Sequence, residues 1–131
     1  MAKSEEKKPT KTELEILSVL WEKGSLTVRE VFELMNSTRR TSYTTILKLM
    51  QIMHEKGLVS RNEKNRAHIY TAKLKQNETG KAMLVELLEK VFSGSASKLV
   101  QQVLEEETTT DEDIREIRRM ISSAEKEARK K

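Results

Sequence analysis

Residues 39–70 read RRTSYTTILKLMQIMHEKGLVSRNEKNRAHIY, and their apolar and polar residues follow separate patterns. The apolar residues of the middle part recur three or four positions apart, as on one face of a helix: Ile46, Leu49, Met50 and Met53. The opposite face of the same helix would carry Thr44, Lys48, Gln51 and Glu55. The whole stretch contains seven Lys or Arg but only two Glu. It therefore predicts a helix that packs one face on a core and offers the other to an anion.

The ends of this helix are marked by residues with capping chemistry. Thr41 or Ser42 can accept a hydrogen bond from the free amides of the first turn, and Gly57 suits the residue after the last turn. Beyond Gly57 the apolar period shifts towards two. LVSRNE (58–63) and AHIYTA (67–72) are β-prone, and KNR between them suits a turn. A β-hairpin is therefore expected after the helix.

Two shorter helices are expected upstream. TELEILSVLWEKG (12–24) offers Thr12 and Glu15 as a capping box, and TVREVFELMN (27–36) offers Thr27 and Glu30 in the same way. Residues 1–11 have no apolar period and are expected to form a loose arm. Three helices followed by a basic hairpin predict a winged helix-turn-helix over residues 12–75, with a two- or three-stranded antiparallel wing.

Residues 76–131 are expected to form three amphipathic helices, which makes the fold mainly α. These helices have little to pack against except each other or a second copy, so we expect a helical dimerisation region and a homodimer. The apolar residues assigned to the dimer contact are Leu99, Val100, Val103, Leu104, Ile114, Ile117 and Ile121.

Composition excludes several classes of function. The chain has no cysteine and two histidines, so thiol chemistry is excluded, and neither a metal nor another cofactor is expected. We find no Ser, His and Asp set and no Gly-rich phosphate loop, so an enzyme is not expected. No apolar run approaches the roughly 18 residues of a membrane span, and a cytoplasmic protein without membrane contact is expected.

The charge is concentrated in the middle of the chain. Residues 39–75 contain nine Lys or Arg and two Glu, whereas residues 76–131 contain ten basic and twelve acidic residues. A basic helix-turn-helix suggests duplex DNA as the partner, with the start of the second helix in the major groove. The residues assigned to base reading are Ser42, Tyr43, Thr44, Thr45 and Lys48. Those assigned to phosphate contact are Arg39, Arg40, Arg61, Lys64, Asn65 and Arg66.

Two other uses of this surface stay open from the residues alone. One is a winged helix that binds acidic protein partners, and the other is a non-specific architectural DNA-binding module. The hydroxyl-rich start of the 42–56 helix favours sequence-reading DNA binding, because threonine can contact base edges and the thymine methyl group.

Three stretches resemble the penicillinase-repressor family of BlaI, MecI and CopY: TELEILSVLWEKGSLTVREVFELM, TSYTTILKLMQIMHEKGLVSR and RAHIYTAK. The resemblance runs over roughly residues 11–125. It implies a homodimeric winged-helix repressor that binds an inverted-repeat operator, with dimerisation through the tail helices.

Two features of that family have no counterpart here. Its β-lactam-responsive members are cut by a protease at an Asn-Phe bond, where this chain has Gln102 and Val103. Its copper-responsive members end in a cysteine cluster, which a chain without cysteine cannot form. The resemblance leaves open whether an effector or a protease triggers release from the operator.

Overall fold

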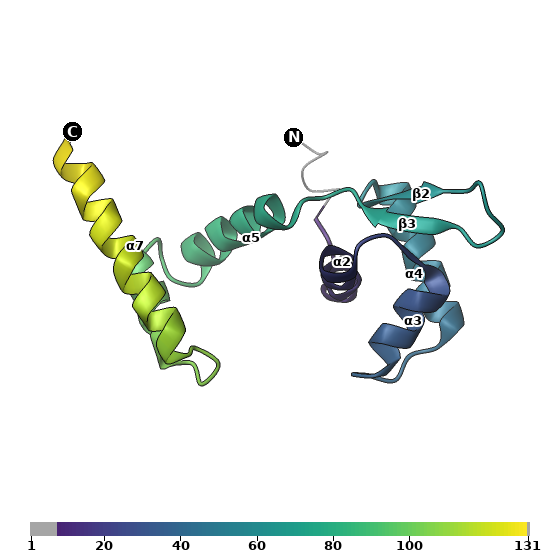
Figure 1. Ribbon diagram of the computed structural model, residues 1–131, viewed down its shortest axis with the longest axis horizontal. Coiled ribbons are helices and arrows are strands. Elements are labelled where there is room, and N and C mark those ends of the chain that lie inside the picture. Colours follow the sequence, from purple (N-terminus) through teal and green to yellow (C-terminus); the bar gives the residue numbers. More distant parts are fainter. Residues whose placement is uncertain (1–7, 131) are drawn as a thin grey trace. The chain divides into compact units, whose positions relative to one another are not determined.

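The computed structural model describes residues 8–130, which form two compact units that divide between Lys81 and Ala82 (Figure 1). The division falls inside helix α5 (Gln76–Lys90), six residues beyond the boundary expected from the sequence. Thr79 of α5 is buried, so the start of this helix belongs to the first unit. Each unit is described by itself below.

The first unit is a winged helix-turn-helix, as predicted. Its helices are α2 (Lys11–Lys23), α3 (Val28–Asn36) and α4 (Tyr43–Lys56), and its strands are β1 (Leu26–Thr27), β2 (Val59–Asn62) and β3 (Ile69–Ala72). The strands form an antiparallel sheet in the order β1-β3-β2, in which Tyr70 lies opposite both Leu26 and Arg61. The sequence pattern predicted no strand at the residues of β1.

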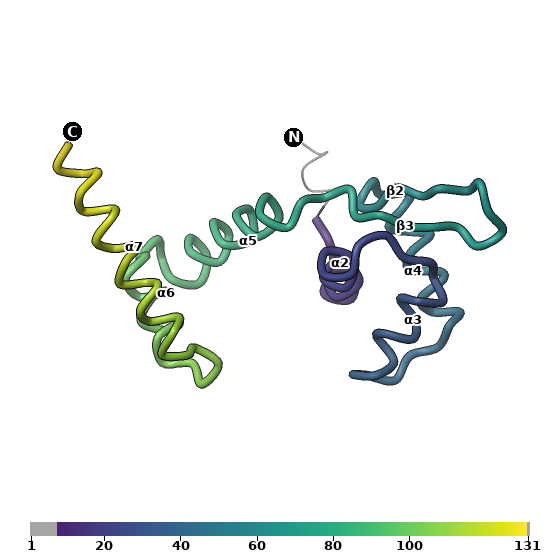
Figure 2. Tube along the Cα trace, viewed as in Figure 1, coloured from purple at the N-terminus to yellow at the C-terminus, as the bar shows by residue number. Residues whose placement is uncertain are grey.

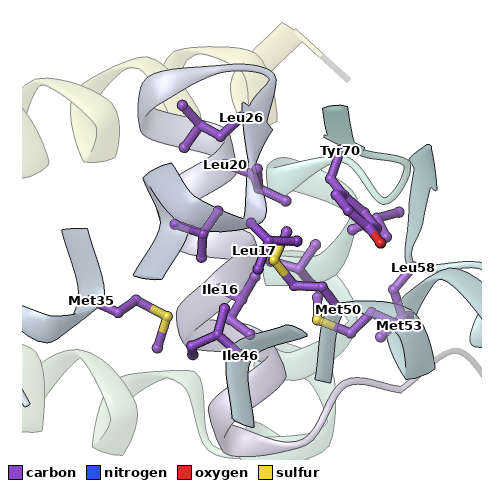
Figure 3. Packing of buried hydrophobic residues seen from close by; sticks show 13 residues of the cluster. Ile16, Leu17, Leu20, Leu26, Met35, Ile46, Met50, Met53, Leu58 and Tyr70 are labelled. Atoms are coloured by element: carbon purple, nitrogen blue, oxygen red, sulfur yellow. The ribbon is translucent and has the colours of Figure 1, made fainter. Parts of the chain in front are cut away.

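The core of this unit lies between the three helices and the sheet (Figure 3). Tyr70 of β3 is 1% exposed, and Met50 of α4 is fully buried. Burying one large apolar side chain contributes about 1.5–3 kcal/mol, so this cluster holds the helices on the sheet. The other buried apolar residues are Ile16, Leu17, Leu20, Leu26, Val28, Val31, Met35, Ile46, Met53, Leu58 and Val59.

The expected capping box of the 12–24 helix is wrong by two residues. Helix α2 begins at Lys11, and its box joins Thr10 to Glu13: the Thr10 N–H donates to Glu13 Oε1 at 2.9 Å, and the Glu13 N–H donates to Thr10 Oγ1 at 3.2 Å. Packing decides this choice, because Glu13 is buried and Glu15 is not. The helix therefore starts within the expected arm, of which residues 1–7 lie outside the described part of the chain.

The ends of α3 and α4 agree with the sequence. Thr27 and Glu30 form the predicted capping box of α3. Ser42 caps α4 by accepting from the Thr45 N–H at 3.1 Å, and Gly57 ends the helix with a φ of 81°. That left-handed conformation is favourable for glycine, which has no Cβ, and it turns the chain directly into β2.

The second unit contains the rest of α5, together with α6 (Ala96–Glu105) and α7 (Asp111–Lys130), whose course is seen in Figure 2. Ser95 caps α6, and Thr110 forms a capping box with Asp113 at the start of α7. Neither α6 nor α7 has a buried residue, so the described part of the chain leaves their apolar stripes at least partly exposed. None of the helices in residues 8–130 is long and apolar enough to cross a membrane.

Candidate nucleic-acid interface

Helix α4 has a buried face and an exposed polar face. Ile46, Met50 and Met53 are fully buried, whereas Thr44 and Lys48 are exposed. Exposed Gln51 continues this polar face and was not among the predicted base-reading residues. Its spacing of three from Lys48 and seven from Thr44 is the sequence signal that places it there.

The hydroxyl groups in the first turn of α4 differ in their contacts. Ser42 Oγ caps the helix and lies 2.8 Å from Thr45 Oγ1, so both hydroxyls take part in the cap. By contrast, Thr44 and Lys48 have no side-chain hydrogen bond or ion pair within residues 8–130. Among the predicted base-reading residues, these two are therefore the most available to an external ligand.

Tyr43 is oriented by an aromatic contact with α3. Its ring meets that of Phe32 edge-to-face, with centroids 5.9 Å apart and planes at 77°. This arrangement suits the ring quadrupoles, positive at the edge and negative on the face. Tyr43 nevertheless remains 41% exposed. The contact therefore holds a large exposed aromatic side chain at the start of α4.

The connection between α3 and α4 is hydrogen-bonded back onto α3. Ser37 Oγ donates to the Leu34 carbonyl at 2.7 Å, and the Thr41 N–H donates to Asn36 Oδ1 at 3.2 Å. These bonds fix the short segment that carries Arg39 and Arg40. Both arginines are exposed at the start of α4, where the sequence placed them.

Only one of these two arginines has a carboxylate partner in the described chain. Arg39 Nη1 donates to Glu15 Oε1 on α2 at 2.7 Å, whereas Arg40 has no ion pair within residues 8–130. This contact was not predicted from the sequence, because Glu15 was assigned to the cap of α2.

The guanidinium of Arg61 is held within the wing. Its Nε and Nη2 lie 2.7 and 2.5 Å from Glu63 Oε2, and its Nη1 donates to the Tyr70 hydroxyl at 3.4 Å. Its central carbon also lies 6.0 Å from the centre of the Tyr70 ring. The hydrogen bonds to Tyr70 and Glu63 raise the pKa of Arg61, and the bond from Arg61 lowers the pKa of Glu63. Both groups are therefore charged at neutral pH.

The tip of the wing carries basic side chains that lack such partners. The connection between β2 and β3 extends away from the helices (Figure 1). Its start is ordered by the Lys64 N–H, which donates to Asn62 Oδ1 at 3.0 Å. Lys64, Asn65 and Arg66 are exposed, and neither Lys64 nor Arg66 forms an ion pair within the described residues. The exposed helix face and this tip are thus polar or basic surfaces of one unit.

Within residues 8–130 there is no group of three side chains suited to hold a metal ion.

Residues 9–123 match the model of the penicillinase repressor family. The chain belongs to this family. The penicillinase repressor of Bacillus licheniformis is 24% identical over 109 residues, which cover 83% of this chain and 85% of that protein. The methicillin resistance regulatory protein MecI of Mammaliicoccus sciuri is 23% identical over 110 residues, covering 84% and 89% of the two chains.

The solution structure of the DNA-binding domain of the repressor BlaI is similar with a TM-score of 0.49 and 24% identity, covering 53% of this chain and 85% of that one. The family match confirms the resemblance that the sequence motifs suggested.

Proposed function

We propose that this penicillinase repressor family member is a homodimeric transcriptional repressor that binds an inverted-repeat DNA operator. The observation that carries the proposal is the exposed face of α4, where Thr44 and Lys48 have no side-chain partner within residues 8–130, while Ile46, Met50 and Met53 on the opposite face are fully buried. In a helix-turn-helix, the N-terminal part of the second helix contacts base edges in the major groove. α4 is that helix here.

The side chains of α4 suit base recognition. The hydroxyl of Thr44 can donate or accept at a base edge, and its methyl group can contact thymine. Lys48 can donate to the O6 or N7 atoms of guanine. Ser42, Thr45 and Tyr43 complete the proposed reading set, the first two mainly by fixing the first turn. Gln51 joins this set as a donor and acceptor suited to adenine.

The residues that flank α4 supply the proposed phosphate contacts. Arg39 and Arg40 precede the helix, and Arg61, Lys64, Asn65 and Arg66 lie in the wing. Each Lys or Arg that neutralises a phosphate releases counterions, so affinity should fall steeply as salt rises. These contacts position the protein on the duplex, whereas the α4 contacts select the sequence.

The tail supports the proposed dimer. Its apolar side chains remain exposed within one chain, including Val100, Val103 and Leu104, and Ile121 is 53% exposed. A second copy of the tail would remove these stripes from water, together with Leu99, Ile114 and Ile117. Two DNA-binding units joined in this way would read two half-sites related by a twofold axis.

Sequence selection tests this proposal. The purified protein is incubated with a random duplex library at near-physiological salt, and the bound fraction is sequenced. We expect an inverted repeat whose half-sites lie about 10 base pairs apart, or a multiple of that distance. Binding without an enriched motif would favour an architectural role. Absence of DNA binding, with binding to acidic proteins, would favour a protein-interaction module.

A further inference from the structure

Two of the arginines assigned to phosphate contact are already paired with carboxylates: Arg39 with Glu15 and Arg61 with Glu63. We propose that Glu15 and Glu63 are intramolecular competitors of DNA phosphate. Each occupies an arginine that a phosphate would otherwise bind, and so lowers DNA affinity and the dependence of that affinity on salt. This inference rests on the proposed function.

The Arg39–Glu15 pair has the geometry of an exchangeable contact. It consists of one short bond, of 2.7 Å, between two side chains that are 47% and 38% exposed. Exposed pairs are weak because water screens them. The capping of α2 by Glu13 leaves Glu15 with no capping role. A phosphate arriving beside the start of α4 can therefore displace Glu15 without disturbing the helix.

Glu63 occupies the edge of Arg61 that a phosphate would use. Guanidinium groups bind carboxylates and phosphates in the same forked arrangement, through two N–H groups on one side. Here Nε and Nη2 both meet one oxygen of Glu63, Oε2, on the side of the guanidinium that such a fork uses, while Nη1 meets Tyr70. Glu63 and a phosphate therefore exclude each other at this edge. The contact of Arg61 with Tyr70 uses Nη1 and not this edge.

Other basic residues of the proposed interface give a contrast within the same unit. Arg40, Lys48, Lys64 and Arg66 form no ion pair within residues 8–130. A phosphate that binds one of these gains a charge contact outright. At Arg39 or Arg61 it only replaces a carboxylate, and it leaves that carboxylate unpaired beside a polyanion. The net gain is smaller at the paired arginines for both reasons.

Neutral variants measure the competition. Glu15→Gln and Glu63→Gln are compared with wild type for binding to the selected operator and to a random duplex, across a series of salt concentrations. We expect each variant to bind both duplexes about two- to fivefold more tightly, the range for one exposed charge contact. The slope of log affinity against log salt should steepen by up to about 0.9 per variant. The ratio of operator to random affinity should stay the same, because phosphate contacts carry no sequence information.

Glu22→Gln is the matched control. It removes the same charge from the same unit, but Glu22 pairs with Lys23, which has no assigned DNA contact. Its effect on affinity should be smaller than that of either test variant. Equal tightening by Glu22→Gln would mean that only net charge matters, and would overturn the proposal.

Each glutamate is also tested in the absence of its arginine. Glu15→Gln in an Arg39→Ala background, and Glu63→Gln in an Arg61→Ala background, should tighten binding less than in the wild-type background, because only repulsion by the carboxylate is then relieved. Equal tightening in the two backgrounds would show that repulsion accounts for the whole effect, and the exchange mechanism would be wrong. Unchanged or weaker binding by Glu→Gln variants with the wild-type melting temperature would also refute the mechanism. A wild-type protein that binds no DNA would instead refute the proposed function.

Discussion

Lys56, in the last turn of α4, donates a hydrogen bond of 2.7 Å to Glu13, in the first turn of α2. Glu13 is only 2% exposed, and the same carboxylate oxygen accepts from the Thr10 N–H. Burial acts to raise the pKa of Glu13, but the bonds from Lys56 and Thr10 outweigh it, and the pKa is lowered. This one carboxylate thus caps α2 and joins it to the proposed DNA-reading helix.

Removing the cation from this pair should destabilise the first unit. Lys56→Met leaves a buried carboxylate without its charged partner, which should cost about 1–3 kcal/mol of unfolding free energy. Urea unfolding at neutral pH measures the loss. Lys23→Met, which breaks an exposed pair with Glu22, should cost less than about 1 kcal/mol. Similar losses in the two variants would contradict the structural role of Lys56.

The same pair predicts a pH dependence of stability. The pKa of Glu13 is lower in the folded protein than its ordinary value of 4.5, so its stabilising effect is complete above pH 4.5. The effect is lost as the pH falls through the folded-state pKa, because the carboxylate then takes up a proton. Wild type should therefore exceed Glu13→Gln in stability at neutral pH, and the difference should shrink in acid. A difference that stays constant across this range would exclude ionised Glu13 as its source.

Trp21 joins α2 to the segment that leads into α5. Its Nε1–H donates to the Leu74 carbonyl at 2.9 Å. Trp21→Phe removes the donor but keeps an aromatic ring, and should cost about 0.5–1.5 kcal/mol. Thermal unfolding followed by circular dichroism measures the change. A melting temperature equal to that of wild type would show that water replaces the indole without loss.

Substitutions on the exposed face of α4 should weaken operator binding. Thr44→Ala and Lys48→Ala each remove a proposed base contact, and each should cost about 1–3 kcal/mol in operator binding. The loss should be smaller on random DNA. Ser18→Ala and Lys23→Ala, at exposed positions of α2, are the matched controls. Operator affinity and sequence preference equal to wild type in the α4 variants would place the reading face elsewhere.

A charge in the apolar stripe of α6 should separate the proposed dimer. Val103→Asp would bury a carboxylate in the interface, where an unpaired charge is strongly unfavourable. Sedimentation velocity should show a monomer with weaker operator binding. Gln102→Asp introduces the same residue at the neighbouring position, outside the apolar stripe, and should remain dimeric. A Val103→Asp monomer that kept full operator affinity would remove the tail from the mechanism.

The local signals in the sequence predicted much of the first unit correctly. The cap of α3 follows from Thr27, which accepts from an amide three residues later. The start of α4 follows in the same way from Ser42, one of the two predicted candidates, and its end follows from Gly57. The core face of α4 follows from its period. The cap of α2 was wrong because TKTELE contains two overlapping boxes, Thr10 with Glu13 and Thr12 with Glu15, that are locally equivalent. Only the burial of Glu13 distinguishes them.

The sequence by itself determined the order of the helices, the hairpin, the basic middle of the chain and the polar face that carries Thr44 and Lys48. Only the tertiary structure decided that β1 completes the sheet and which carboxylate meets which cation. Glu13 and Lys56 are 43 residues apart in the chain, and Glu15 and Arg39 are 24 apart. Helical periodicity places each of these side chains on a face of its own helix. Their contact depends on how the packed core brings those helices together, which no local pattern encodes.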